Sequence, residues 1–427
     1  MLTKLIRHAV AILALALLLG APRVFAAGPG AAPAIGKGTP GESTPAATDA
    51  GRKLKEYLEA RAAFEAEQDA YWSLITQKRR TRYAKRRDHQ SITLDDYVLS
   101  QPPAYNGPKR PPGAEVGPTR PRPQKVIPVV ADLVKAASDY YQWAPQRPAS
   151  DIEFKRAYAR YAANAGLTRE QAVRVYAFET GGNGTHASQS GFQGSHAISS
   201  AIGYNQLLTT NTVELLAEQG DVFVKELKQR AATLAGPARA AMEHKIAVLK
   251  KMVALACSVP DDWGQHEKIG DTPQGWALHA MVLDIDVGPM LQTHKLLTSV
   301  VFAQQKGHMR PLTAAELEMM NLTGDGTGLD MVTMPPGMRE QVPTSNFFVR
   351  SGYQRNPVAI RHNTVAKLLA ITDSRMDTNS NQPGARELGS VFGPTQFSLR
   401  CCAAGAGNGE TGDRQFVPNM NLPSPSR

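Results

Sequence analysis

Glu179 is the side chain whose position in this 427-residue chain best suits proton-transfer chemistry. Apolar residues at helical spacing predict a helix over residues 168–179, which Thr168 and Gln171 open as a capping box. The pair Gly181-Gly182 is expected to end this helix. Glu179 would then lie at the negative end of the helix dipole, among aromatic side chains, and both effects disfavour its ionisation. A carboxyl group that stays protonated near neutral pH can act as a general acid.

The stretch after Glu179 favours this interpretation over that of an exposed glutamate at a helix end. From Thr180 to Val213 the chain has no Asp, Glu, Lys or Arg, although 20% of all residues are charged. The stretch is rich in Gly, Ser, Thr, Asn, Gln and His, and it contains Phe192 and Tyr204. Neutral amides and hydroxyls beside aromatic rings suit a groove that binds sugar hydroxyls and N-acetyl groups. A flexible Gly/Ser loop is the alternative.

Helical patterns dominate the segments around this stretch. They cover residues 129–141, 151–165, 212–257, 274–300 and 363–376. Breaks are expected near Gly220 and at Gly236-Pro237, and the stretch from Asp325 to Asp330 is expected to be a plain turn. No run of alternating β-branched residues occurs, so the sequence predicts a mainly α fold.

The N-terminus has the plan of a secretory signal peptide. A short basic start with Lys4 and Arg7 precedes the apolar run from Ala9 to Leu19, and Val24-Phe25-Ala26 fits a cleavage site. An uncleaved anchor helix is the alternative, but the apolar run is short for a membrane span. Cleavage would remove residues 1–26 and lower the formal net charge from +10 to +7. We therefore expect a bacterial periplasmic or secreted protein without an integral membrane domain after cleavage.

Composition divides the rest of the chain into segments. Residues 27–50 are predicted to be a flexible linker, residues 51–100 a basic amphipathic helical segment, and residues 101–128 a Pro-rich spacer. Residues 129–376 would form the catalytic domain with a C-terminal extension, and residues 377–427 a disordered tail. The basic block from Lys78 to Arg87 is interpreted as a solvated face that approaches anionic envelope polymers, or as a charged helix end without a partner.

Several function classes are excluded by what the sequence lacks. It has no phosphate-loop motif and no Gly-x-Ser-x-Gly motif, and its three cysteines form no Cys-x-x-Cys pair. His186 and His196 are too far apart in the loop for a typical zinc motif. We expect no metal, no other cofactor and no nucleic-acid partner.

Three motifs, in order, resemble those of the soluble lytic transglycosylases, which belong to the lysozyme-like superfamily. They are Glu179-Thr180-Gly181-Gly182, then Ala201-Ile202-Gly203-Tyr204-Asn205-Gln206-Leu207-Leu208, and then Asp284-Ile285-Asp286-Val287-Gly288-Pro289. The resemblance covers roughly 120 to 150 residues. Tyr204-Asn205 replaces the family's Leu-Met, Asp286 replaces its Asn, and the 27 residues from Glu179 to Gln206 exceed the usual spacing. The chain would therefore be a divergent member.

The resemblance implies cleavage of the β-1,4 bond between N-acetylmuramic acid and N-acetylglucosamine in peptidoglycan, with formation of 1,6-anhydro ends. Glu179 would be the only acid and base. Thr180, Tyr204, Gln206 and Asp286 would bind substrate, with Tyr204 stacking on a sugar or belonging to the core. The implied partners are peptidoglycan glycan strands, with cell-envelope proteins as further candidates.

Two alternatives remain open at the level of sequence. The non-standard Tyr204-Asn205 and Asp286 also fit a non-catalytic peptidoglycan-binding or scaffold protein on a lysozyme-like fold. If Asp286 supplies a second carboxylate, a hydrolytic lysozyme is favoured instead.

Overall fold

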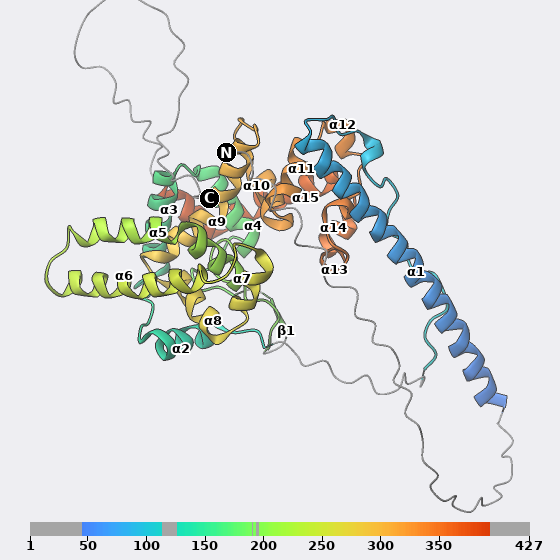
Figure 1. Ribbon diagram of the computed structural model, residues 1–427, viewed down its shortest axis with the longest axis horizontal. Helices are drawn as coiled ribbons and strands as arrows, with labels where there is room; N and C mark the ends of the chain where they lie inside the picture. The colour runs from blue at the N-terminus through green and yellow to red at the C-terminus, as the bar shows by residue number, and fades with distance from the viewer. Residues whose placement is uncertain (1–44, 113–125, 190, 194–195, 393–427) are drawn as a thin grey trace, which may run out of the picture. The chain divides into compact units, whose positions relative to one another are not determined.

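The computed structural model describes residues 45–112, 126–189, 191–193 and 196–392 (Figure 1). This part of the chain is mainly helical, which confirms the predicted fold class. Its named strands, β1 (Phe192–Gln193) and β2 (His196–Ala197), pair antiparallel as a short hairpin. Its helices include none that is both long and apolar enough to cross a membrane. The predicted signal peptide, residues 1–26, lies outside the described residues.

A first hydrophobic core lies between α5 (Thr209–Ala231) and α6 (Gly236–Ala256). The short elements that pack around this pair are α2 (Val130–Tyr141), α7 (Trp263–Gly270), α8 (Pro273–His279) and η2 (Ala280–Leu283). The break expected at Gly236-Pro237 is confirmed. The break expected near Gly220 is wrong, because α5 runs unbroken through it. A Cβ at Gly220 would clash with Val253, so the glycine allows α5 to pack closely against α6.

A second core brings the predicted catalytic glutamate and the polar turn together. It is formed by α3 (Asp151–Ala165), α4 (Arg169–Thr180), α9 (Val287–Gln305), α10 (Ala314–Thr323) and α16 (Pro383–Val391). Helix α9 is central, since it packs against α3, α5, α10 and α11 (Asp325–Thr333). The capping box that opens α4 is confirmed: Gln171 N donates to Thr168 Oγ1 at 3.1 Å, and Thr168 N donates to Gln171 Oε1 at 3.1 Å.

A third core joins the N-terminal helix to the C-terminal helices. Tyr71, Trp72 and Ile75 of α1 (Pro45–Arg87) pack on Phe347 and Leu368. The other elements around it are η1 (Leu94–Asp96), α12 (Pro336–Arg339), η3 (Thr344–Phe347), α13 (Arg350–Gln354), α14 (Pro357–Arg361) and α15 (Val365–Ser380).

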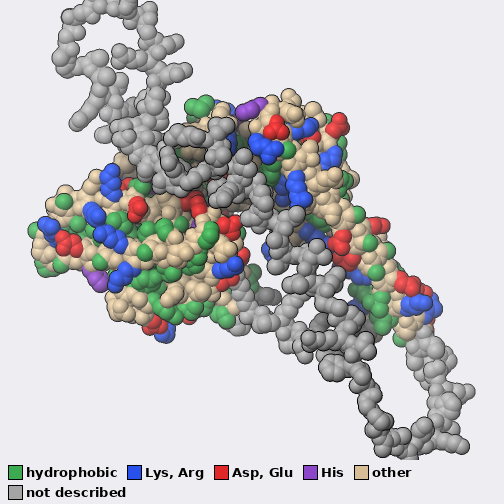
Figure 2. Space-filling model, viewed as in Figure 1, with side chains coloured by type: hydrophobic (Ala, Val, Ile, Leu, Met, Phe, Trp, Pro, Cys, Tyr) green, Lys and Arg blue, Asp and Glu red, His purple; other side chains and the backbone are tan. Residues whose placement is uncertain are grey.

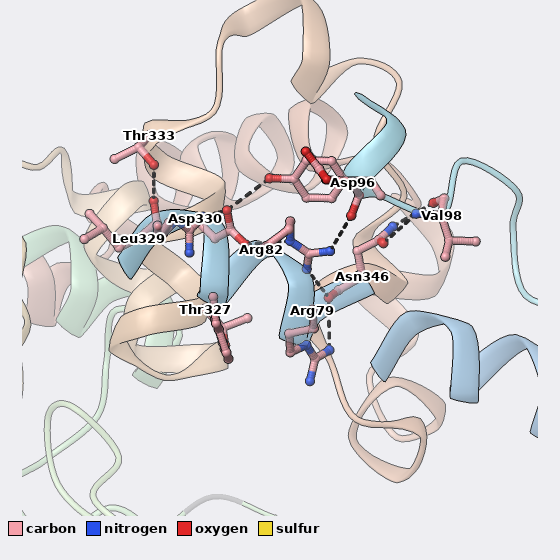
Figure 3. Close-up of polar contacts among 12 residues, drawn as sticks. Arg79, Arg82, Asp96, Val98, Thr327, Leu329, Asp330, Thr333 and Asn346 are labelled. Atoms are coloured by element: carbon pink, nitrogen blue, oxygen red, sulfur yellow. Dashed lines mark hydrogen bonds and ion pairs between the residues drawn. The ribbon is translucent and has the colours of Figure 1, made fainter. Parts of the chain in front are cut away.

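Three arginines in the basic block of α1 contact residues beside this core, so the interpretation of the block as a solvated face is wrong for them. Arg79, Arg82 and Arg86 recur at helical spacing and face the C-terminal helices. Arg82 is fully buried, and its Nε donates to Asp330 Oδ2 at 3.1 Å while its guanidinium lies 4.3 Å from the centre of the Tyr97 ring (Figure 3). Arg86 also pairs with Asp330. Arg80 and Arg87 are exposed.

Two predicted segment boundaries and one predicted turn are corrected. The tail expected to be disordered from residue 377 continues as α15 to Ser380 and as α16 to Val391, because α16 packs on α3 and α4. The linker predicted to end at residue 50 gives way to α1 at Pro45. Asp325 to Asp330 is the start of α11, where Gly328 allows close approach to the backbone of Met320.

Candidate active site

Glu179 lies in the last turn of α4, and its carboxyl group turns toward α9 and α10. Asn321 Nδ2 donates to Glu179 Oε1 at 2.9 Å. Lys295 of α9 acts on Glu179 through its charge. Burial raises the pKa of Glu179 to about 7, although Lys295, Asn321 and Glu318 each lower it. At neutral pH the group is therefore divided between its protonated and ionised forms.

Glu318 is a second hydrogen-bond partner of Glu179, and sequence reasoning missed it. Its buried carboxyl group forms a side-chain hydrogen bond with the Glu179 carboxyl group. Burial, together with the charge of Glu179, holds the pKa of Glu318 well above its usual range. The available signal was an acid between apolar neighbours in Ala314-Ala315-Glu316-Leu317-Glu318-Met319-Met320, a stretch whose methionines indicate packing.

Further carboxyl groups surround Lys295. Burial lowers the pKa of the Lys295 ammonium group, and the charges of Glu214, Asp325, Glu179 and Glu318 oppose that shift. Asp325 accepts a hydrogen bond from Ser299 Oγ at 2.6 Å. Figure 2 shows acidic side chains gathered on the face over α7 and α9. Lys295 is thus the cationic centre of a carboxyl-rich site contributed by α4, α5, α9, α10 and α11.

The turn from Gly203 to Leu207 is fixed on the same helix as Lys295. Asn205 N donates to Gln292 Oε1 at 2.8 Å, and Asn205 Nδ2 donates to the Gln292 carbonyl oxygen at 2.7 Å. Gly203 has a left-handed φ of 84°, and a Cβ there would clash with Gln292 Nε2. Gln292 and Lys295 are one helical turn apart on α9. The structure therefore brings the first two sequence motifs together.

The predicted substrate-binding residues of these two motifs make internal contacts. Thr180 Oγ1 donates to the Tyr176 carbonyl oxygen at 2.7 Å. Gln206, with a left-handed φ of 43°, donates from Nε2 to the Gly203 carbonyl oxygen at 2.7 Å and to that of Ser188 at 3.1 Å. Both side chains are partly exposed. A ligand could reach them only in competition with these hydrogen bonds.

Tyr204 belongs to the core, so of its two predicted alternatives the core position is confirmed and stacking on a sugar is wrong. Its side chain is fully buried. Its ring meets those of Phe154, Tyr158 and Tyr176 edge-on, with centroids 4.8 Å apart in the closest pair, Tyr176 and Tyr204. Its hydroxyl donates to Asp151 Oδ1 at 3.2 Å. This aromatic cluster holds the turn against α3 and α4.

Asp286 lies at the start of α9, away from Glu179. It is buried and forms ion pairs with Lys245 and Arg230. Nine residues of helix, about 13 Å, separate it from Lys295. It borders a hollow of about 390 Å³ whose lining includes Tyr161, Glu226 and Arg230 and does not include Glu179. The structure therefore separates Asp286, the predicted site residue of the third motif, from Glu179.

His186, one of the two loop histidines, packs against α3. His186 Nδ1 lies 3.3 Å from Asp151 Oδ1, and its ring stacks on Phe154. No group of three or more His, Cys, Asp or Glu side chains in the described ranges is arranged to hold a metal ion.

Comparison with known proteins gives no match. No protein-family model matches the chain, and neither a curated protein nor a solved structure matches it.

Proposed function

We propose that this chain is an exported lytic transglycosylase of lysozyme-like fold that cleaves peptidoglycan glycan strands with Glu179 as its acid and base. The observation that carries the proposal is the placement of Glu179. Its carboxyl group has a pKa of about 7. The residue lies in the last turn of α4, directly before the uncharged loop. The Gly203–Leu207 turn after that loop is bound to the same central helix, α9.

In this reaction Glu179 first acts as an acid. Its proton passes to the glycosidic oxygen as the bond from that oxygen to C1 of N-acetylmuramic acid breaks. The N-acetyl carbonyl oxygen of the same sugar stabilises the positive charge at C1. Glu179, now ionised, takes the proton from the C6 hydroxyl, and the C6 oxygen bonds to C1 and releases the N-acetyl group. A group with a pKa of about 7 serves both steps near neutral pH.

The positions of Glu318 and Asp286 favour a one-carboxyl mechanism over the two-carboxylate scheme of hydrolytic glycosidases. In that scheme the two groups are roughly 5 to 9.5 Å apart and flank the sugar. Glu318 hydrogen-bonds Glu179 directly, which leaves no room for a sugar ring between them. Asp286 is tied to Lys245 and Arg230 at the far end of α9. Neither group is placed as a nucleophile or as the base for a water opposite Glu179.

The second candidate function is a non-catalytic peptidoglycan-binding or scaffold protein. It is favoured by the internal hydrogen bonds of Thr180 and Gln206 and by the position of the 390 Å³ hollow, which Glu179 does not border. Under either function the N-terminal segment would direct export, and the positive net charge of the chain would suit an anionic wall polymer.

Digestion of purified sacculi by the mature protein tests the proposal. We expect wild type to release muropeptides with 1,6-anhydro ends, detected by mass spectrometry, and Glu179→Gln to lose this activity by about 10²- to 10⁴-fold. Glu170→Gln is the matched control, since Glu170 is an exposed acid on the same helix as Glu179. Reducing ends would identify a hydrolase. Binding to sacculi with no released product would support the non-catalytic function.

A further inference from the structure

The carboxyl group of Glu318 is buried, and no cation among the described residues is in hydrogen-bond contact with it. Among the described residues, those that bond its side chain are Glu179 and Asn321. Asn321 Nδ2 lies 2.9 Å from Glu179 Oε1 and 3.5 Å from Glu318 Oε2, so a single amide group faces both acids. An amide Nδ2 only donates. It can therefore stabilise a negative charge on either acid, and it supplies no acceptor for their protons.

The direct contact between the two acids fixes how many protons they hold. An ionised carboxylate only accepts hydrogen bonds, so two ionised carboxylates cannot bond to each other. The Glu179–Glu318 bond therefore requires a proton on one of them. Because Glu318 is the more deeply buried, its ionisation costs more desolvation energy, which places the shared proton on Glu318 and the acceptor on Glu179.

We propose that Glu318 is a positioning residue that shares one proton with Glu179 through a direct carboxyl–carboxyl hydrogen bond, and thereby orients Glu179 and sets its protonation state. The role of Glu318 in catalysis rests on the proposed function. The shared proton is independent of that function. When Glu179 is ionised, protonated Glu318 donates to it and stabilises its charge. When Glu179 is protonated, the pair holds two protons and Glu179 is ready to donate.

Other charged groups near this pair come from the elements that surround it. Helix α9 brings Lys295, whose charge favours ionisation of both acids. Helices α5 and α11 bring Glu214 and Asp325, which act on Lys295. On the outer side of α4, Arg174 is paired with the exposed Asp373 and Asp377 of α15. On α16, Glu387 is paired with Lys155 of α3.

Carboxyl titration followed by NMR tests the shared proton without any assay of activity. The full mature protein is labelled with ¹³C at the glutamate side-chain carboxyl, and the signal that Glu179→Gln removes is assigned to Glu179. Glu318→Met removes the donor, so we expect the midpoint of Glu179 to rise by about one pH unit, or tenfold in proton affinity. Glu318→Gln keeps a donor at the same place, so the midpoint is expected to stay within about half a pH unit of wild type. Glu214→Gln is the control near Lys295 without a bond to Glu179.

The outcomes separate this proposal from the proposed function. An unchanged Glu179 midpoint in Glu318→Met, or equal shifts in Glu318→Met and Glu214→Gln, would overturn the shared proton. If wild type releases anhydro-muropeptides, the acid-to-base transition of the pH–rate profile should move upward in Glu318→Met and recover in Glu318→Gln. If wild type releases none while the titration shows the expected shift, the proposed function fails and the proton-sharing pair stands.

Discussion

Two pairs of carboxyl groups, each near a lysine, differ in what neutralises them: one precedes the first turn of α9, and the other lies near Lys295 at the middle of this helix. Asp284 and Asp286 are bound by Lys245, whose Nζ lies 2.9 Å from Asp284 Oδ1, and Arg230 also pairs with Asp286. Glu179 and Glu318 are bonded to each other, and Lys295 acts on them through charge. The first pair is thus paired with cations, whereas we propose that the second pair is neutralised by a shared proton.

The largest expected effect breaks the first pair. Lys245→Met leaves two buried carboxyl groups without their main cation, so we expect it to lower the free energy of unfolding by roughly 3–5 kcal/mol. Urea unfolding at neutral pH measures this loss. Lys250→Met, an exposed position on the same helix, is the matched control and should change stability by less than about 0.5 kcal/mol. Equal stability of the two variants would show that the ion pairs of Asp284 and Asp286 contribute nothing.

The second pair predicts a pH dependence of opposite sign to that of most paired acids. The folded-state pKa of Glu179, about 7, lies above its ordinary value of 4.5, so the folded protein binds this proton more tightly than the unfolded chain. Stability from this group is full below pH 4.5 and is lost as the pH rises to about 7, by about 1.4 kcal/mol for each pH unit between these two values. Urea unfolding across this pH range should show a smaller loss for Glu179→Gln than for wild type. A wild-type curve parallel to that of the variant would contradict the raised pKa.

A glycine substitution tests whether the turn on α9 depends on close packing. Gly203→Ala combines a left-handed φ with a clash against Gln292 Nε2, so we expect a loss of about 1–3 kcal/mol, measured as a lower Tm. Gly236→Ala is the matched control, because its φ of 56° is also left-handed but open space surrounds it. The difference between the two variants isolates the clash. If both variants lose the same stability, the Gln292 side chain moves aside at little cost and does not fix the turn.

The smallest expected effect concerns Asn321. Asn321→Leu removes the 2.9 Å hydrogen bond to Glu179, so the pKa of Glu179 should rise, because this bond lowers it. We expect the titration midpoint to move by less than about one pH unit, since Glu318 still donates. The ¹³C-carboxyl titration measures it, with Leu322→Ala at an exposed neighbouring position as the control. A lower midpoint in Asn321→Leu would mean that the amide does not stabilise the charge of Glu179.

The residues whose placement was predicted correctly depend on local signals. Thr168 and Gln171 are three positions apart, and a capping box needs nothing beyond one helical turn, so the start of α4 could be derived from sequence. Its end at Gly181-Gly182 follows from the left-handed φ that glycine adopts without strain. The direction of the Glu179 pKa shift also followed, because a helix end among aromatic residues indicates partial burial.

The residues whose roles were missed or mistaken depend on contacts between distant segments. Arg82 and Asp330 are 248 positions apart, and Glu179 and Asn321 are 142 apart. Nothing near Arg82 in the sequence distinguishes it from its exposed neighbour Arg80, because burial depends on which face of α1 meets the C-terminal helices. Likewise, helical spacing could not reveal that Tyr204 points into the second core.

The sequence by itself determined that this protein is mainly helical and that Glu179 ends a helix before an uncharged loop, since helix periodicity, caps and glycines act within a few residues. Only the tertiary structure decided which acid stands beside Glu179 and which acids are held by cations. Desolvation and hydrogen bonding set those properties, and both depend on how α4, α5, α9 and α10 pack together.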